Sequence, residues 1–309
     1  MALARSRSRK DLVLRVPAST SNLGPGFDAF GVALNHVLKV SWEPAEKLEL
    51  SREGRLAESV LPVGKDPVLR GLRRAAILAA ATLPPGRVTV EAAFAPGRGM
   101  GASGAGIVAG LLLGGRLCGS SPPPEVLLDE AIQLEGHPEN AAASLLGGAH
   151  WSTQDADKRW LHLPVTLHQD LRFLLIVPPF PLATQRAREV LPSSVSFQRA
   201  AAQAGRPPVL LEGLRLLDER LIRSGIRDEL HVEARLKQLT GAKSMMDFAN
   251  RAGAIATTLS GAGSALLVLT RRGQLQQLEQ RLRQRVKRLW GESGEVLRAQ
   301  AEAKGAAFD

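Results

Sequence analysis

The feature that most constrains this chain is a glycine-rich segment between two apolar segments. Residues 88–94 alternate and predict a strand, and residues 107–113 are apolar and predict a buried helix. A strand, a glycine loop and a helix in this order favour phosphate binding, because glycine lets backbone N–H groups approach an anion and the helix N-terminus adds partial positive charge. We expect ATP phosphates to bind the loop residues Pro96, Gly97, Arg98, Gly99, Met100, Gly101, Ala102, Ser103, Gly104, Ala105 and Gly106.

Two side chains of this loop suit a phosphate site. Ser103 offers a hydroxyl to a phosphate or its Mg²⁺, and Arg98 offers a cation. The formal G-x-G-x-x-G pattern from Gly99 to Gly104 lacks the second strand and acidic residue that a dinucleotide-binding fold needs about 20 positions later, and the Walker pattern is absent from the sequence. A tight turn without a ligand stays the alternative interpretation of this segment on its own.

The composition limits the class of protein. At 309 residues the chain is long enough for two domains, and 44% hydrophobic with 23% charged residues is typical of a globular protein. The single cysteine, Cys118, excludes a disulfide within the chain and favours a reducing compartment, so we expect the cytoplasm. No uninterrupted apolar run reaches the length of a membrane span, so we expect no membrane partner.

The net charge of +10 is compatible with a nucleic-acid partner. However, the basic residues are spread along the C-terminal segments and residues 1–10, and the chain has few aromatic residues on which bases could stack. We therefore expect no nucleic acid as a partner. The basic residues 1–10 predict a disordered tail.

The remaining pattern predicts a mixed α and β protein in two domains, 1–163 and 164–309. The polar segment 17–28 predicts a loop outside the core, and Asn35-His36 predicts a turn between two strands. A second glycine turn, with Gly261 and Gly263, lies between apolar strands. Strands are predicted at 11–16, 29–34, 37–42, 88–94, 149–152, 160–163, 171–177, 254–260 and 264–269, and helices at 68–81, 107–113, 124–134, 194–203, 209–223, 228–239, 245–254 and 274–289.

Four segments, taken in order, resemble the GHMP kinases and, within that family, the homoserine kinases. They are Val16-Pro-Ala-Ser-Thr-Ser-Asn-Leu-Gly-Pro-Gly-Phe-Asp28, the loop 96–106, Glu135-Gly-His-Pro-Glu-Asn140 and Leu259-Ser-Gly-Ala-Gly263. The resemblance implies an α+β fold, with an N-terminal domain like domain 2 of ribosomal protein S5, a ferredoxin-like C-terminal domain and the active site between them. It also implies ATP-dependent phosphorylation of the L-homoserine hydroxyl in threonine biosynthesis, and, by analogy, a homodimer.

The resemblance also implies roles for particular residues. ATP would bind the loop 96–106 together with Gly261 and Gly263, and Mg²⁺ would bind Ser103 and an acidic residue on the following helix. Asp129 and Glu130 are both candidates for that acid, and we take Glu130. Homoserine would contact Asn22, Asp28, His137, Arg188 and Arg235, with the two arginines on its carboxylate.

No general base is expected where other GHMP kinases have an aspartate. Asn140 stands there, and an amide cannot accept a proton at neutral pH. The hydroxyl proton would therefore pass to a phosphate oxygen, with Asn22 or Thr184 orienting the hydroxyl. The sequence departs from the motifs usual in the family, with Ala102 for Ser, Gly104 for Ala, Glu139 for Asp and Ser264 for Pro, and with Asp66-Pro67 where the family often has Asn.

Two other functions stay open at the level of sequence. One is a GHMP kinase for another small alcohol, such as shikimate or an isoprenoid precursor. The other is a nucleotide- or nucleic-acid-binding protein without catalysis, which the single loop serine, Ser103, and the charge of +10 would support.

Overall fold

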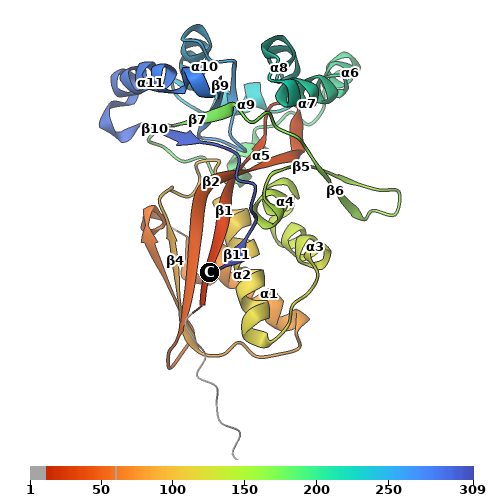
Figure 1. Ribbon diagram of the computed structural model, residues 1–309, viewed down its shortest axis with the longest axis vertical. Coiled ribbons are helices and arrows are strands. Elements are labelled where there is room, and N and C mark those ends of the chain that lie inside the picture. The colour runs from red at the N-terminus through yellow and green to blue at the C-terminus, as the bar shows by residue number, and fades with distance from the viewer. Residues whose placement is uncertain (1–11, 60) are drawn as a thin grey trace, which may run out of the picture.

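The computed structural model describes residues 12–59 and 61–309, so the predicted tail 1–10 lies outside the described residues. The first sheet has the order β11-β1-β2-β4-β3, and the hairpin of β5 and β6 branches from β2 (Figure 1). Neighbouring strands along this order are antiparallel, except that β3 and β4 are parallel to each other. The strands are β1 (Leu12–Asn22), β2 (Gly26–Pro44), β3 (Glu49–Gly54), β4 (Gly86–Ala92), β5 (Ala149–Gln154), β6 (Trp160–Pro164) and β11 (Ala307–Phe308).

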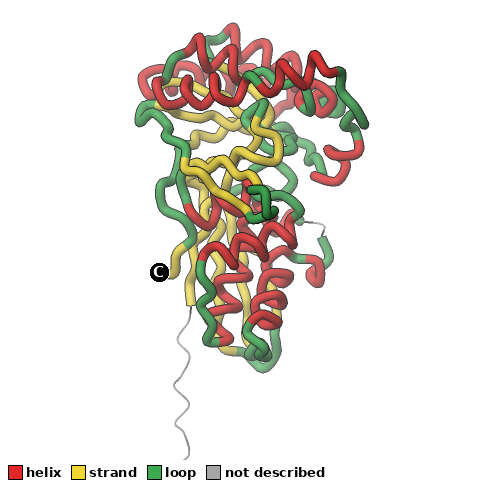
Figure 2. Tube along the Cα trace, turned by 90° about the vertical axis from the view of Figure 1, so that its right-hand side faces the viewer, coloured by secondary structure: helices red, strands yellow, loops and turns green. Residues whose placement is uncertain are grey.

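Four helices cover one face of this sheet (Figures 1 and 2). They are α1 (Pro67–Leu78), α2 (Ala102–Cys118), α3 (Pro124–Glu135) and α4 (Glu139–Leu146). The helix α2 lies innermost, because its residues are apolar or small on nearly every side. Asp66 caps α1 by accepting a hydrogen bond from the backbone N–H of Val68, and Pro67 occupies the first turn, where its missing N–H costs nothing.

The second sheet is antiparallel, with the order β10-β7-β9-β8. Counted along the chain, these strands lie in the order 4-1-3-2 and alternate with helices as in a ferredoxin-like unit. The strands are β7 (Leu171–Val177), β8 (Ala256–Leu259), β9 (Leu266–Arg271) and β10 (Glu295–Ala299). The helices are α5 (Thr184–Glu189), α6 (Phe197–Ala204), α7 (Arg206–Leu216), α8 (Glu219–Gly225), α9 (Val232–Leu236), α10 (Ala242–Arg251) and α11 (Leu275–Trp290).

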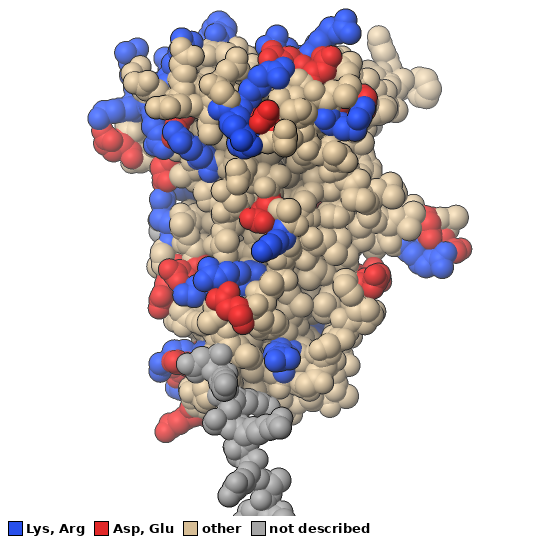
Figure 3. Space-filling view, viewed as in Figure 1, with Lys and Arg blue, Asp and Glu red and all other residues tan. Residues whose placement is uncertain are grey.

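Short 3₁₀ turns complete the elements at Arg55–Glu58, Val63–Lys65, Arg272–Gln274 and Gly291–Ser293. Within residues 12–59 and 61–309, no helix is both long and apolar enough to cross a bilayer. Lys and Arg side chains gather over the C-terminal half on the face shown in Figure 3, with acidic side chains among them. Many of these cations have local partners, such as Arg283 with Glu279 on α11.

The prediction of a loop outside the core at residues 17–28 is wrong for its first half, because residues 17–22 continue β1 into the core. Ser19, Thr20 and Asn22 are all buried. They are polar yet buried because each has a partner from a distant segment: Ser19 Oγ donates to Asn140 Oδ1 at 2.9 Å, and Thr20 Oγ1 and Ser260 Oγ are 2.8 Å apart.

The predicted turn at Asn35-His36 is also wrong. The strand β2 runs unbroken through these residues. The register of β1 against β2 shifts from Pro17↔Val37 to Ala18↔Leu34, so Asn35 and His36 are the extra residues of a bulge.

The C-terminal residues return to the first sheet. Ala301 forms a bridge with Leu34, and β11 pairs with β1. The chain passes from the first sheet to the second between β6 and β7. The division into domains 1–163 and 164–309 stays a prediction.

Candidate active site

A cavity of about 510 Å³ brings together most of the residues that the sequence predicts for the site. Its walls come from the tip of the β1–β2 hairpin, the loop before α2, α4, α5, α9 and the turn between β8 and β9. Both halves of the chain therefore build the cavity. The predicted residues that line it outside the glycine loop are Asn22, Asp28, His137, Thr184, Arg188, Arg235, Gly261 and Gly263.

The glycine loop is shaped by backbone conformations that other residues rarely adopt. Gly99 and Gly101 have φ of +70° and +64°. A Cβ atom on Gly99 would lie 2.0 Å from the Ser260 carbonyl oxygen, and one on Gly101 would lie 2.0 Å from Ser19 Oγ. Ser260 Oγ also donates to the Gly99 carbonyl oxygen at 2.6 Å. The loop is therefore held against the C-terminal half while its last residues begin α2.

Eight of the eleven loop residues line the cavity, and Arg98, Gly104 and Ala105 do not. Arg98 Nη1 donates to the Pro178 carbonyl oxygen at 2.8 Å, and Nη2 donates to that of Pro179 at 3.4 Å. The Arg98 guanidinium thus joins the loop to the segment after β7 and does not line the cavity, and a role of Arg98 in phosphate binding stays a prediction.

The acid beside Ser103 is Glu135, which the sequence analysis did not assign to the metal. Ser103 Oγ donates to Glu135 Oε2 at 2.8 Å. Glu130, the expected partner, instead accepts hydrogen bonds from Arg74 on both carboxylate oxygens. The two glutamates are five residues apart on α3, which turns them about 140° from each other around the helix. Glu130 therefore does not lie beside Ser103, and Glu135 takes that place; which acid binds Mg²⁺ stays a prediction.

Two further acids surround His137. Its Nδ1 lies 3.0 Å from Glu139 Oε1, and its Nε2 lies 3.7 Å from Glu135 Oε1. Burial lowers the pKa of His137, but Glu139, Glu135 and Asp28 together outweigh burial and raise its pKa above the ordinary value. Burial raises the pKa of Glu135, while His137 and the Ser103 hydroxyl oppose that rise. The acids at this wall therefore favour the protonated form of His137 over the form that burial alone would favour.

Asp28 and Arg188 form a bidentate ion pair. Arg188 Nη1 and Nη2 donate to the two Asp28 oxygens at 2.9 and 2.8 Å. Arg188 lies on α5, four residues after Thr184, so both side chains face the cavity from the same side of this helix. The hydrogen bonds that Arg188 donates to Asp28 raise the pKa of Arg188. The pair joins the first hairpin to the C-terminal half.

Arg235 is a buried cation without an acidic partner among the described residues. Its side chain donates to the Ala187 carbonyl oxygen at 3.1 Å and to His231 Nδ1 at 3.1 Å, and its guanidinium lies 5.2 Å from the Phe27 ring centroid. Only 2% of the residue is exposed. Burial, together with the nearby charge of Arg188, lowers the pKa of Arg235 to about 10. A buried charge of this kind favours an anionic ligand.

His231 is held as the neutral tautomer that suits Arg235. Its Nε2 lies 2.9 Å from the Gly24 carbonyl oxygen and donates to it, which leaves Nδ1 to accept from Arg235. Burial lowers the pKa of His231 and keeps the ring neutral. The sequence pattern does not single out His231, so the hydrogen bond between His231 and Arg235 is known only from the structure.

Asn22 lies where the first hairpin meets the second glycine turn. Its Nδ2 donates to the Gly261 carbonyl oxygen at 2.9 Å, and its Oδ1 accepts from the Asp28 backbone N–H at 3.0 Å. One N–H of the amide is left for a ligand. Asn140 lies close by and donates to Glu139 Oε1 at 2.8 Å.

The other end of the cavity is mainly apolar and was not predicted. Leu38, Leu56, Leu61, Val68 and Val90 form this wall. An ion pair of 2.8 Å between Arg52 Nε and Asp66 Oδ2 borders it. Apolar side chains beside a glycine loop offer apolar contacts to a heterocycle.

Known proteins of one family are similar to this chain in sequence. A sequence profile described as GHMP kinases N terminal domain matches residues 68–148. A homoserine kinase of Prochlorococcus marinus is 31% identical over 296 residues, which cover 94% of this chain and 92% of that protein. A homoserine kinase of Synechococcus sp. is 36% identical over 262 residues, which cover 84% of this chain and 83% of that protein.

Solved structures show the same fold. The crystal structure of homoserine kinase from Cytophaga hutchinsonii covers 100% of both chains with a TM-score of 0.84 at 22% identity. L. major mevalonate kinase has a TM-score of 0.70 at 14% identity, over 94% of this chain and 96% of its own. The expected two-domain α+β GHMP kinase fold is thereby confirmed. With the sequence identity to curated relatives over most of its length, this chain belongs to the homoserine kinases within the GHMP kinase family.

Proposed function

We propose that the protein transfers the γ-phosphoryl group of ATP to the side-chain hydroxyl of L-homoserine and so makes O-phospho-L-homoserine for threonine biosynthesis. The main support for an amino acid as the substrate is Arg235, a buried cation that lines the cavity and has no acidic partner among the described residues. The carboxylate of an amino acid would supply the missing charge.

The cavity offers partners to both charged ends of homoserine. Arg235 faces the carboxylate. Glu139 is 2% exposed, and its Oε2 has no hydrogen-bond partner among the described side chains, so it offers an acceptor to the ammonium together with Asp28. An uncharged alcohol would leave Arg235 and Glu139 Oε2 without these partners, and a carboxylate without an ammonium would leave Glu139 Oε2 without one, which disfavours both classes.

ATP would place its base in the apolar end of the cavity and its phosphates on the loop 96–106. The N–H groups in the first turn of α2 have no partner within the helix, and they lie where Gly101 leads into Ala102. Backbone donors and the helix dipole then stabilise phosphate charge without a lysine.

The residues at Ser103 suit Mg²⁺. A hydroxyl and a carboxylate are the hard oxygen ligands that Mg²⁺ prefers, and Ser103 Oγ and Glu135 Oε2 already lie 2.8 Å apart. No cluster of three or more His, Cys, Asp or Glu within the described ranges could hold an ion on its own, so phosphate oxygens and waters would complete the coordination. The ion would neutralise charge on the β- and γ-phosphates.

The chemical step needs positioning more than a base. The homoserine hydroxyl oxygen forms a bond to the γ-phosphorus, the bond to the bridging oxygen of the β-phosphate breaks, and ADP leaves with that electron pair. The hydroxyl proton passes to an oxygen of the transferred phosphoryl group, because the amide of Asn140 cannot take it. The remaining N–H of Asn22 and the Thr184 hydroxyl orient the acceptor from the cavity wall.

Measuring ADP release with L-homoserine, D-homoserine, shikimate and mevalonate tests the assignment. We expect turnover with L-homoserine alone, and turnover with another alcohol in its place overturns the proposal. Asp28→Asn is expected to raise the KM for homoserine about tenfold or more, because Arg188 loses its charged partner. Asp170→Asn is the control, since Asp170 pairs with Arg272 at the surface. Unchanged kcat and KM in Asp28→Asn would show that Asp28 has no role in substrate binding.

The homodimer and the cytoplasmic location are parts of the proposal that need their own measurements. Light scattering on the purified protein gives the number of chains in solution, and fractionation of the source cells gives the compartment.

A further inference from the structure

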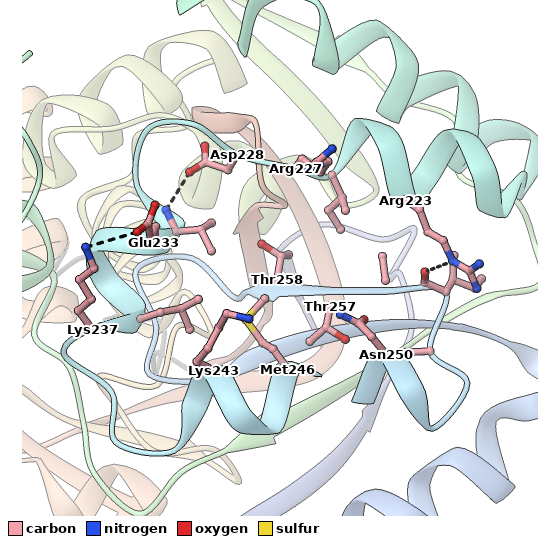
Figure 4. A pocket seen from close by; sticks show the side chains of 16 residues that line it. Arg223, Arg227, Asp228, Glu233, Lys237, Lys243, Met246, Asn250, Thr257 and Thr258 are labelled. Carbon is pink, nitrogen blue, oxygen red and sulfur yellow. Dashed lines mark hydrogen bonds and ion pairs between the residues drawn. The ribbon is translucent and has the colours of Figure 1, made fainter. Parts of the chain in front are cut away.

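A second cavity, of about 650 Å³, lies in the C-terminal half and takes no part in the proposed reaction (Figure 4). The strand β8 forms its floor, and α9, α10 and the segment after α8 form its sides. β8 is the edge strand of the second sheet, because β9 is the one strand that pairs with it in the described chain. The cavity therefore opens onto an uncovered sheet edge.

The floor carries unused hydrogen-bonding groups. Thr257 and Thr258 are 6% and 2% exposed, and neither Oγ1 has a hydrogen-bond partner within residues 12–59 and 61–309. In an antiparallel pair, the backbone N–H and C=O groups of successive residues point alternately toward the partner strand and away from it. Ser260 donates its N–H to the Ala265 carbonyl and so points toward the partner strand. With the register of β8 against β9, the N–H and C=O of Thr257 therefore point away from β9, to the open edge. Buried polar groups without partners cost free energy, so these groups favour an occupant that can bond to them.

Four cations stand at the rim of the cavity, and three of them are in ion pairs: Arg223 with Glu219, Lys237 with Glu233 and Lys243 with Asp247. Figure 4 shows Arg223 and Arg227, with Lys237 and Lys243 on the other sides, against two acids, Asp228 and Glu233. The Asp228 carboxylate is used inside the protein, because it accepts from the first backbone N–H groups of α9. Arg227 has no ion-pair partner in the described part of the chain, while Glu233 pairs with Lys237 at 3.4 Å.

Apolar side chains fill the space between rim and floor. They belong to Ile226, Val232, Leu236 and Met246. A ligand that matches this cavity has a group that can bond to one threonine hydroxyl or to the open edge of β8, an apolar body and an anionic group at the mouth. Arg227, the rim cation without an ion-pair partner in the described part of the chain, favours that anionic group.

Two elements belong to the walls of both cavities. The helix α9 presents Val232 and Leu236 to the second cavity and Arg235 to the active site. Similarly, β8 supplies Thr257 to the second cavity and runs into the turn with Gly261, which lines the active site. A ligand that moves either element therefore moves groups that contact the substrates.

We propose that the second cavity is an effector site for a small organic anion with an apolar body, and that its occupancy changes the affinity for homoserine through α9. The change in homoserine affinity rests on the proposed function, whereas binding at the cavity does not. The probes are 8-anilinonaphthalene-1-sulfonate, an apolar anion that fluoresces when it binds, and hexanoate as its competitor.

Fluorescence titration of the full chain tests binding. Hexanoate is expected to displace the dye, and hexan-1-ol, hexylammonium and inorganic phosphate are not. Arg227→Glu is expected to weaken dye binding about tenfold, and Thr257→Val to weaken hexanoate binding several-fold. Arg159→Glu, on the β5–β6 hairpin far from the cavity, is the charge-matched control and is expected to bind as the wild type does. Equal binding by the wild type and both cavity variants overturns the site.

Steady-state kinetics test the coupling. Saturating hexanoate is expected to change the KM for homoserine by about fivefold in the wild type and to have no effect in Arg227→Glu. A KM that does not respond in the wild type overturns the coupling. If the chain does not phosphorylate homoserine at all, the proposed function fails while the dye titration still decides whether the cavity binds an anion.

Discussion

Replacing Arg235 with methionine is expected to separate folding stability from substrate binding. The pKa of Arg235 falls to about 10, chiefly because burial disfavours its charge. Each pKa unit corresponds to ~1.4 kcal/mol, so holding this charge costs the folded state about 3 kcal/mol at neutral pH. The sign follows from linkage: the unfolded chain holds the proton more tightly than the folded one, so the full cost applies at every pH below the folded value.

Methionine removes that cost and keeps most of the side-chain volume. It also leaves two acceptors without their donor, the Ala187 carbonyl oxygen and His231 Nδ1, at ~1 kcal/mol each. The free energy of unfolding should therefore rise by about 1 kcal/mol. Homoserine affinity should fall about 100-fold, because a buried charge-assisted contact to the carboxylate is lost. Urea unfolding gives the first quantity and calorimetric titration with homoserine gives the second.

Arg74→Met is the matched control and should give the opposite result. Arg74 pairs with both oxygens of Glu130, which is 8% exposed, so its removal leaves a buried carboxylate without its cation. We expect this variant to lose about 3 kcal/mol of stability and to keep its homoserine affinity. If Arg235→Met instead lost more than ~2 kcal/mol and still bound homoserine normally, Arg235 would be a structural cation and our substrate assignment would be refuted.

Three further predictions concern the metal, the pH and the loop. Glu135→Gln is expected to raise the Mg²⁺ concentration needed for half-maximal rate about tenfold, whereas Glu130→Gln leaves it unchanged; equal effects would contradict the metal assignment. The pKa of His137 is raised, so the stability it contributes is complete below pH ~6.5 and declines as the pH rises through the raised value. His137→Gln should flatten this decline in urea unfolding at a series of pH values, and an unchanged slope would locate the effect elsewhere. Gly101→Ala should weaken ATP binding by fluorescence titration, because its Cβ would lie 2.0 Å from a serine hydroxyl, while Gly119→Ala, also at positive φ but in open space, should bind ATP normally.

The sequence was sufficient for the parts of the site that lie in contiguous motifs. The loop 96–106 was predicted from its glycines, and Asp28 and Arg188 were predicted from the resemblance to the GHMP kinases; the structure brings most of these residues to one cavity, while their roles stay predictions. Periodicity was less informative for Glu130 and Glu135, because both lie on one helix and only the packing of α3 decides which one faces Ser103. The sequence pattern provides no signal for the orientation of that helix.

Buried polar residues were the second source of error. Ser19 and Thr20 have the composition of a loop, and their burial depends on partners more than 100 residues away in the chain. The apolar slot near Leu38 and Val90 was missed for a similar reason, because its walls come from separate elements that meet only in the folded chain. Single-sequence patterns describe neighbours along the chain, and these features depend on neighbours in space.

The return of the last strand to the first sheet has a consequence for how this protein is made. Residues 301–309 contact Leu34 and β1 only after the whole second sheet has left the ribosome. The edge of β1 is therefore uncovered during most of synthesis, when it is open to pairing with other nascent chains.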